Sequence, residues 1–208
     1  MVLVTKARRR GGVGTHLLKR CITEVQASGA VAGLDATEQG RPIYLPLGFR
    51  DLYRISRWHF GGMKDVASTA DVRAMTAADL PAVLAYDRKL SGMDRPELLT
   101  HLAARQPTMA FVAESGGFVL GREGRTAYSI GPIIADDEAT GLALIGRAAS
   151  SVPGPFIIDV PEAHAEIRRW LEKQGAVSPR GYVRMTLGSA PGLDDPSHVF
   201  ALAGPELG

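Results

Sequence analysis

The feature that most constrains the fold of this 208-residue chain is a basic, glycine-rich segment near its start. The segment RRRGGVGT, residues 8–15, follows a short apolar run at 1–4 that favours a β-strand. After it, from 15 to 27, apolar residues recur at helical spacing, and Gly29 follows where a left-handed cap is needed. The sequence therefore predicts a strand, a loop and an amphipathic helix in direct succession.

Such a loop suits the binding of a phosphate group. It directs several backbone N–H groups and a helix N-terminus at one place, and glycine lets a bulky anion come close to the backbone. The arginines beside it add donors that match phosphate oxygens. A solvated basic turn is the alternative. A Walker loop is excluded because no Gly-Lys-Ser/Thr follows. A dinucleotide fingerprint fits poorly because the glycine spacing differs and because the acid about 20 residues further on, Asp35, follows the second strand by only one residue.

The segment resembles motif A of the GCN5-related N-acetyltransferases (GNAT), whose R-x-x-G-x-G signature is matched by Arg9, Gly12 and Gly14. The resemblance implies that the loop binds the pyrophosphate of acetyl-coenzyme A and that the strand at 1–4 contacts the pantetheine arm. The cofactor-binding residues that it implies are Val2, Leu3, Val4, Arg9, Arg10, Gly11, Gly12, Val13, Gly14 and Thr15.

A second family feature is a tyrosine on a short helix, four residues before a Gly-Phe pair. Tyr44 matches it, ahead of Gly48 and Phe49. By resemblance, the Tyr44 hydroxyl would protonate the departing coenzyme A thiolate, which suits a phenol with a pKa of roughly 10. The alternative is a tyrosine that only fills the core.

The rest of the chain alternates short apolar runs with helical patterns. We expect strands at 31–34, 49–60, 72–75, 109–114, 118–122, 126–134, 156–159 and 182–187, and helices from 41, from about 80, at 94–104, 138–151 and 163–174. A weak internal repeat relates Leu34-Asp35, a helix and Gly48 to Ile158-Asp159, a helix and Gly175.

These elements predict an α/β (α+β) fold of two GNAT-like units with mixed, mostly antiparallel sheets flanked by helices. We place the C-terminal half of an acetyl-CoA-binding domain at 1–60, a linker at 61–70 and a second, diverged GNAT-like domain at 71–208. The whole chain is similar to tandem bacterial acetyltransferases with an active first domain. The first unit lacks its early strands, so we expect further N-terminal residues, or strands from another chain, to complete it.

The second unit lacks both functional features. Its loop reads Ala135-Asp136-Asp137-Glu138, whose carboxylates would repel a pyrophosphate. These acids could bind a cation, but acids that open a helix already have a structural purpose. The position four residues before Gly175 is Leu171, which cannot donate a proton. We therefore interpret this unit as a non-catalytic partner that shapes the substrate side.

Composition limits the other classes of function. The net charge of +2 argues against a general nucleic-acid binder, and the apolar runs fall short of a membrane span. The sole cysteine, Cys21, is expected in the core and fits a reducing cytoplasm. No metal site is expected, because the histidines have no ligand spacing: His16, His59, His101, His164 and His198.

The leading hypothesis is transfer of an acetyl group from acetyl-CoA to a primary amine, by direct attack in a ternary complex. The acceptor is either a small molecule or a protein amine, the general base is not identified, and a homo-oligomer is compatible with the sequence. The alternative is a non-catalytic acyl-CoA sensor or interaction module. A third reading makes both halves structural relics.

Overall fold

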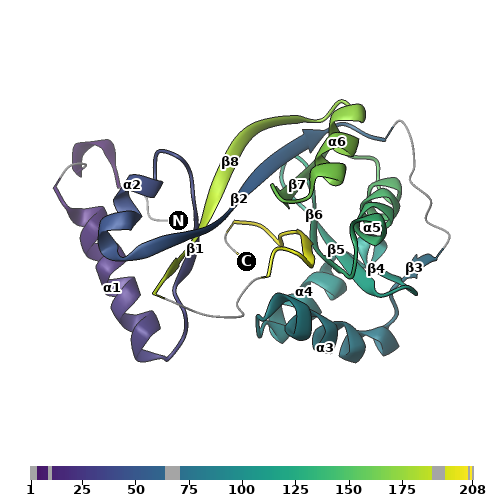
Figure 1. Ribbon diagram of the computed structural model, residues 1–208, viewed down its shortest axis with the longest axis horizontal. Helices are drawn as coiled ribbons and strands as arrows, with labels where there is room; N and C mark the ends of the chain where they lie inside the picture. Colours follow the sequence, from purple (N-terminus) through teal and green to yellow (C-terminus); the bar gives the residue numbers. More distant parts are fainter. Residues whose placement is uncertain (1–3, 9–10, 64–70, 189–194, 206, 208) are drawn as a thin grey trace.

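The computed structural model describes residues 4–8, 11–63, 71–188, 195–205 and 207. Its strands form one mixed, mostly antiparallel sheet in the order β1-β8-β2-β7-β6-β5-β4-β3, with β9 attached to β6 (Figure 1). Helices cover both faces of this sheet. The predicted α/β class, with mostly antiparallel strands flanked by helices, is therefore confirmed.

The first sixty residues follow the predicted order closely. The helix expected at 15–27, the short helix after Arg41 and the strand at 49–60 are confirmed, whereas the strand expected at 31–34 lies two residues later. The strand expected at 1–4 lies outside the described residues, apart from Val4. The elements are η1 (Lys6–Arg8), α1 (Val13–Ala27), β1 (Gly33–Ala36), α2 (Arg41–Tyr44), η2 (Leu45–Leu47) and β2 (Phe49–Phe60).

From residue 72 onward the predicted elements are present with small shifts at their ends. The capping box expected at Thr76 and Asp79 is formed, with both reciprocal hydrogen bonds. The elements are β3 (Val72–Ala74), η3 (Ala77–Asp79), α3 (Leu80–Ser91), α4 (Pro96–Arg105), η4 (Pro107–Met109), β4 (Phe111–Ala113), β5 (Gly117–Glu123), β6 (Tyr128–Ala135), α5 (Glu138–Ser150), β7 (Phe156–Pro161), α6 (Ala165–Lys173), β8 (Val177–Leu187) and β9 (Val199–Ala201).

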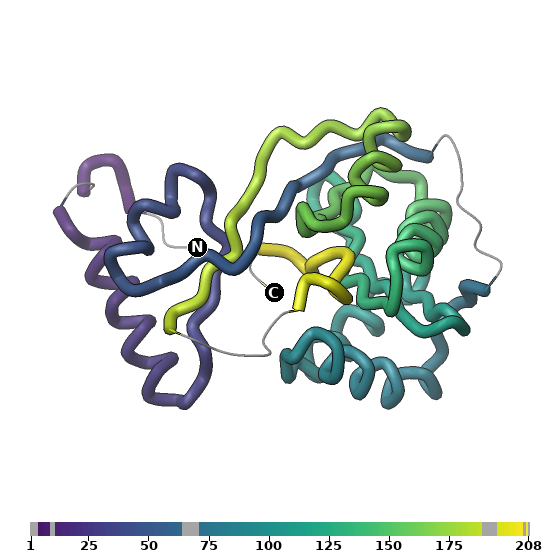
Figure 2. The backbone as a smooth tube through the Cα atoms, in the orientation of Figure 1, coloured from purple at the N-terminus to yellow at the C-terminus, as the bar shows by residue number. Residues whose placement is uncertain are grey.

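Two parts of the chain exchange strands in the centre of the sheet. The segment β1-α2-β2 and the segment β7-α6-β8 have the same order of elements. In the sheet, however, β8 lies between β1 and β2, and β2 lies between β8 and β7. Figure 2 shows β2 and β8 running side by side across the molecule. Each long strand completes the other segment's part of the sheet, so the two parts share one continuous sheet. The domain boundary expected at 61–70 stays a prediction.

The exchange is held by two matching ion pairs. Asp35 on β1 faces Arg184 on β8, with hydrogen bonds of 2.8 and 2.9 Å, and the guanidinium of Arg184 lies over the ring of Tyr53. In the same way Asp159 on β7 accepts two 2.7 Å hydrogen bonds from Arg57 on β2. The Arg57 guanidinium lies over the ring of Tyr182. The aspartates of the internal repeat thus have equivalent roles, one in each segment.

The core has three clusters, set by the alternation of side chains along the strands. Under α3 and α4, Leu99 and Leu102 pack with Phe118 and Leu120 of β5. On the opposite face Val119 of the same strand packs with residues of α5 and α6. A smaller cluster joins α1 and α2 to β1, β2 and β8. The larger part of the core therefore lies in the part of the chain after residue 71.

β9 was not expected from the sequence, and it fills a gap between two parallel strands. β6 and β7 pair only from Tyr128 and Phe156 to Ile130 and Ile158. Beyond that point β9 pairs antiparallel with β6, while the Leu202 N–H donates to the Asp159 carbonyl on β7 at 3.0 Å. β9 thus connects the separated ends of β6 and β7.

The apolar side of α1 is only partly covered. None of its residues is buried among those described, and Leu17 keeps 45% of its surface exposed. The prediction that Cys21 lies in the core is wrong, because the side chain is exposed. Helical spacing identified the apolar side of α1 correctly but could not show what packs against it. None of the helices in the described residues is both long and apolar enough to cross a bilayer.

Candidate functional site

The glycine-rich loop leaves the start of α1 open. Gly12 is the N-cap residue with φ 76°, a left-handed conformation that other residues adopt only with strain, and no described side chain caps the helix. The first N–H groups of a helix have no partner within the helix, and together with the helix dipole they attract an anion. A β-carbon on Gly14 would lie 3.6 Å from Val4 Cγ2. Val4, the last residue of the apolar run at 1–4, therefore lies beside the first turn of α1.

Only part of the predicted donor site can be placed. Val4 and the residues Gly11, Gly12, Val13, Gly14 and Thr15 lie together at the start of α1. Val2, Leu3, Arg9 and Arg10 lie outside the described residues. Before the loop, Lys6 and Arg8 are exposed in the short turn η1, where the Arg8 N–H donates to the Thr5 carbonyl at 2.9 Å. The described part of the loop thus carries positive charge next to an open helix N-terminus.

Tyr44 is the last residue of α2 and is half-buried. Its ring meets the ring of Phe49 edge-on, with centroids 5.9 Å apart. Both belong to the cluster that includes Ile22 of α1 and Met185 of β8. Packing therefore fixes the Tyr44 ring on the same side of the sheet as α1, whichever role its hydroxyl has.

At the matching place after β6, acidic side chains serve the protein itself. Asp137 is the N-cap of α5 and accepts from the Thr140 N–H at 2.7 Å, and the hydrogen bonds from Thr140 lower the pKa of this carboxyl. Glu138 accepts from the Ile167 N–H of α6 at 2.9 Å. Burial and the neighbouring Asp136 carboxylate raise the pKa of the Tyr86 hydroxyl. The structural reading of these helix-opening acids is confirmed for Asp137 and Glu138.

The space between β6 and β7 is also taken. β9 occupies it with fully buried side chains, among them Phe200 at 2% exposure and Ala201 at 0%. Gly131 of β6, with φ 138°, lies against the Leu202 carbonyl, where a side chain would collide. Leu171, at the position that matches Tyr44, is fully buried on α6. A ligand could enter between these strands only by displacing β9.

The described histidines do not form a metal centre. His164 is buried; its Nε2 donates to the Val199 carbonyl at 2.9 Å, and burial lowers the pKa of this ring. His198 bonds the Ala135 carbonyl through Nδ1 at 3.1 Å, and both rings thereby fasten β9 and the residue before it. Within the described residues no three His, Cys, Asp or Glu side chains are grouped so that they could hold a metal ion.

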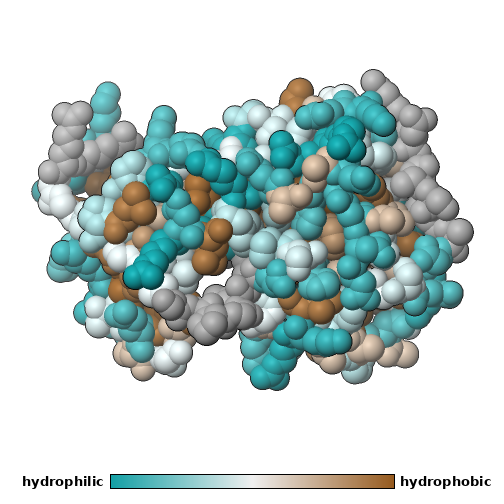
Figure 3. Space-filling view, viewed as in Figure 1, coloured by the Kyte–Doolittle hydropathy of each residue, from teal (hydrophilic) through white to brown (hydrophobic). Residues whose placement is uncertain are grey.

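The sequence did not indicate a cleft between β1–β8 and the loop that joins α3 to α4. This cavity of about 510 Å³ is lined by Asp35 on β1, Arg184 and Thr186 on β8, Gly92–Arg95 of that loop and Leu207 of the tail, among others. Figure 3 shows the molecule hollowed between the part that carries α1 and the part that carries α3–α5. No sequence pattern could have found the cleft, because its walls come from separate segments, at 30–35, 92–95 and 184–186 and at Pro205 and Leu207, that only the fold brings together.

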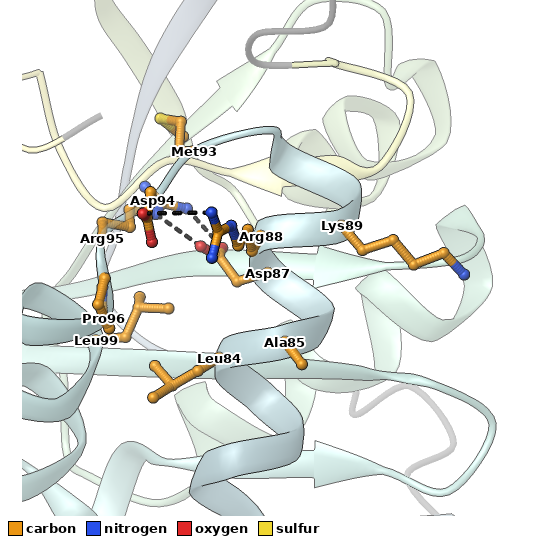
Figure 4. Close-up of a pocket in the computed structure, with 10 residues that line it drawn as sticks. All are labelled: Leu84, Ala85, Asp87, Arg88, Lys89, Met93, Asp94, Arg95, Pro96 and Leu99. Carbon is orange, nitrogen blue, oxygen red and sulfur yellow. Dashed lines mark hydrogen bonds and ion pairs between the residues drawn. The ribbon is translucent and has the colours of Figure 1, made fainter. Parts of the chain in front are cut away.

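The loop of this cleft is held in place by a buried ion pair. Arg95 donates to Asp87 of α3 at 2.9 and 3.1 Å, as Figure 4 shows, and the two side chains are 9% and 2% exposed. A second cavity of about 420 Å³ lies around this pair. Four of its charged groups pair with one another, Arg95 with Asp87 and Arg88 with Asp94, so this second cavity offers less to a ligand.

A family profile described as "Acetyltransferase (GNAT) domain" matches residues 83–201, which is more than half of the chain. Two curated relatives are the uncharacterized N-acetyltransferase YitH of Bacillus subtilis and the holothin acyltransferase of a Pseudoalteromonas species. They are 25% and 28% identical over 84% and 85% of this chain. The chain spans only 64% and 62% of their lengths.

Solved structures share the fold. A candidate acetyltransferase of Pyrococcus horikoshii is 26% identical, covers 96% of this chain and 68% of its own, and has a TM-score of 0.78. A GCN5-related N-acetyltransferase of Sphaerobacter thermophilus is 16% identical over 93% of this chain and 73% of its own, with a TM-score of 0.62. At this identity the second likeness concerns the fold alone.

Proposed function

Because the chain belongs to the GNAT acetyltransferase family, we propose that it transfers an acetyl group from acetyl-CoA to a primary amine within a ternary complex. The observation that carries the proposal is the open N-terminus of α1, with a left-handed glycine as its N-cap and basic residues just before it. These features fit a pyrophosphate, which needs several N–H donors at one place and close approach to the backbone.

The donor site of the proposal consists of the loop and the strand before it. Gly11, Gly12, Val13, Gly14 and Thr15 would donate backbone N–H groups to the pyrophosphate. Arg9 and Arg10 would add charge-assisted hydrogen bonds. Val2, Leu3 and Val4 would lie along the pantetheine arm. Acetyl-CoA supplies the activated thioester, so positioning beside the acceptor accounts for much of the catalysis.

In the chemical step the amine nitrogen forms a bond to the thioester carbonyl carbon, and the carbon–sulfur bond breaks. Tyr44 would give its hydroxyl proton to the departing sulfur and regain one from water. The packing of its ring against Phe49 limits the directions in which the hydroxyl can point. The nitrogen of the product loses its extra proton to solvent or to a base outside the residues assigned here.

The proposal assigns one donor site to the chain. In the part after residue 71, Asp137 caps the helix that follows β6, and β9 fills the space between β6 and β7. An anion would meet carboxylates there instead of free N–H groups. This part would shape the acceptor side and would bind no acetyl-CoA.

Calorimetric titration with acetyl-CoA tests the donor site, and we expect one molecule to bind per chain. The double variant Arg9→Glu with Arg10→Glu should weaken binding by about a hundredfold or more, because each charge-assisted hydrogen bond contributes about 1.5–3 kcal/mol. Arg125→Glu with Arg180→Glu is the matched control, since both arginines are exposed and outside the loop. Equal affinities of the two double variants would contradict the proposal.

Tyr44→Phe separates an enzyme from an acyl-CoA sensor. In an enzyme kcat should fall roughly a hundredfold or more, the usual contribution of a general acid, while the Kd for acetyl-CoA is kept. Thiol release in a screen of primary amines is the measurement. A protein that binds acetyl-CoA but releases no thiol with any amine, before or after the substitution, would support the sensor.

A further inference from the structure

We propose that the cleft between β1–β8 and the α3–α4 loop is the acceptor site, and that it takes a small primary amine with an apolar body and one hydrogen-bonding group. This inference rests on the proposed acetyl transfer, since it names the acceptor of that reaction. The cleft is separate from the loop that would hold the pyrophosphate, because Asp35, Arg184 and Thr186 lie on the opposite face of the β1–β8 pair from α1 and Tyr44. Among the described strands β1 is at the edge of the sheet, so the acetyl end of the donor would have to reach the amine around that edge.

The cleft is built by both parts of the chain. Residues on and before β1 form one wall, and Met93 with Asp94 of the α3–α4 loop form the other. Figure 1 shows β1 facing the near ends of α3 and α4. Its volume of about 510 Å³ falls within the ~300–1,000 Å³ that small-molecule sites occupy. A small molecule therefore fits the cleft better than a folded protein surface.

A buried hydroxyl in the wall points to a hydrogen-bonding ligand. Thr186 is 3% exposed, and its Oγ1 has no hydrogen-bond partner among the described residues. Burying a hydroxyl without a partner is unfavourable, so native structures seldom leave one unless water or a ligand satisfies it. Because Thr186 lines the cleft, a ligand bound there could accept or donate the missing hydrogen bond.

The charges of the cleft favour a single amine over a polyamine. Asp35 and Arg184 bond each other at 2.8 and 2.9 Å, and the Asp35 side chain is only 1% exposed. Arg95 is bonded to Asp87. Asp94 keeps 65% of its side chain exposed and lies 3.6 Å from the equally exposed Arg88, a loose surface pair. One exposed carboxylate at the rim can attract one ammonium group.

The remaining lining is largely apolar. Val31 and Leu52 are 46% and 44% exposed, and both line the cleft. Met93 and Leu207 line it from the opposite side. An apolar ligand body would cover these side chains and gain affinity from the removal of water.

The test measures amine binding directly, without acetyl transfer. Four probes are titrated into the full chain by calorimetry: tyramine, 2-phenylethylamine, spermidine and an unstructured pentapeptide with a free N-terminus. We expect the two arylalkyl amines to bind more tightly than the other two. Tyramine should bind about five- to tenfold more tightly than 2-phenylethylamine, because only tyramine carries the hydroxyl that can pair with Thr186.

Two substitutions locate the site. Leu52→Trp adds bulk to an exposed position in the lining and should weaken both arylalkyl amines by at least about tenfold. Val177→Trp is the matched control, because Val177 is an exposed apolar residue, at 62%, on the end of β8 away from the cleft. Thr186→Val keeps the shape of the side chain and should remove the preference for tyramine, while 2-phenylethylamine keeps its affinity.

The inference is overturned if neither arylalkyl amine binds, if spermidine or the pentapeptide binds best, or if Leu52→Trp acts no differently from Val177→Trp. Titration with acetyl-CoA in parallel separates this failure from that of the proposed function. Normal acetyl-CoA binding with an unaffected amine affinity in Leu52→Trp refutes the cleft alone. Amine binding that Leu52→Trp blocks, in a protein that does not bind acetyl-CoA, supports the cleft and refutes the acetyl transfer.

Discussion

The segments 4–27 and 128–150 each lead through a short loop into a helix that lies on the shared sheet, but they differ in burial. α5 is buried over most of its length, and Leu144 and Ile145 are completely inaccessible. α1 has no buried residue among those described, and Val13 and Leu17 remain more than 40% exposed. Both helices are amphipathic, so the sequence pattern alone does not determine how much of a helix is covered.

The loops before α1 and α5 also differ, because only the loop before α5 supplies a side chain that caps its helix. Asp137 uses its carboxylate to cap α5, whereas Gly12 leaves the start of α1 uncapped. Beside α5, β9 joins β6 to β7 through the carbonyl of Asp159 and the N–H of Ala135. The loop before α5 and the ends of β6 and β7 thus have these polar groups satisfied within the protein. The start of the chain keeps donors that a ligand could satisfy, at the expense of stability.

The largest effect should follow from removing the ring that anchors β9. Phe200 is 2% exposed; its ring lies 4.2 Å from that of His164 and packs against Gly141 of α5. Phe200→Ala should lower the free energy of unfolding by about 3–5 kcal/mol, because it leaves a cavity in the core. Urea denaturation followed by circular dichroism measures this loss.

If Phe200→Ala does not fold, Phe200→Leu should still fold with a smaller loss. Val177→Ala is the control, because this exposed side chain should change stability by no more than about 0.5 kcal/mol. A loss below about 1 kcal/mol for Phe200→Ala would mean that β9 is a loosely held tail and that the difference between the two segments is overstated.

The next effect compares the two helices directly. Leu144→Ala in α5 should cost about 2–5 kcal/mol, since Leu144 is completely buried. Leu17→Ala in α1 should cost no more than about 0.5 kcal/mol in this chain, since alanine has a high helix propensity and Leu17 loses little packing. Chemical denaturation of both variants measures the two losses in the free energy of unfolding. Similar losses would show that something covers α1 in solution, for example a second copy of the chain.

Much of the local structure could be predicted because short-range patterns carry it. The capping box at Thr76, the strand at 49–60 and the helix at 138–151 were visible as cap residues and hydrophobic periodicity. The strand exchange was not visible, because the pairing of β2 with β7 and β8 joins residues that lie from 96 (Phe60 and Phe156) to 138 (Phe49 and Leu187) positions apart. β9 was missed because a three-residue apolar strand has too little periodicity to be recognised.

The candidate site was predictable only where it is local. The glycine loop could be recognised because its chemistry depends on consecutive residues, although Arg9 and Arg10 lie outside the described part. The acceptor cleft could not be recognised from the sequence. Thr186 becomes significant only in the folded chain, where β8 lies beside β1 and the buried Thr186 hydroxyl has no described hydrogen-bond partner. The prediction that Cys21 is buried was wrong for a related reason, since the burial of a helix face depends on what packs against it.

The smallest effect concerns the caps, and it depends on pH. Asp137→Ala should lower stability at pH 7 by about 1 kcal/mol, the usual cost of losing an N-cap, while Asp137→Gly, which imitates Gly12, should cost only a few tenths. Hydrogen bonds from Thr140 hold the pKa of Asp137 below its ordinary value of 3.8. The unfolded state therefore takes up the proton first as pH falls, so this contribution is fully present above the unfolded pKa and disappears as pH falls through the folded one.

Urea denaturation of the unsubstituted chain and of Asp137→Ala, between pH 7 and pH 3, measures the difference. We expect the gap between the two proteins to be constant at neutral pH and to narrow steadily below about pH 4. Asp137→Gly should show a small gap throughout. If the difference in unfolding free energy between the unsubstituted chain and Asp137→Ala is unchanged at pH 3, the charged cap is not its cause. Helix propensity would then account for the difference in stability between the start of α5 and that of α1.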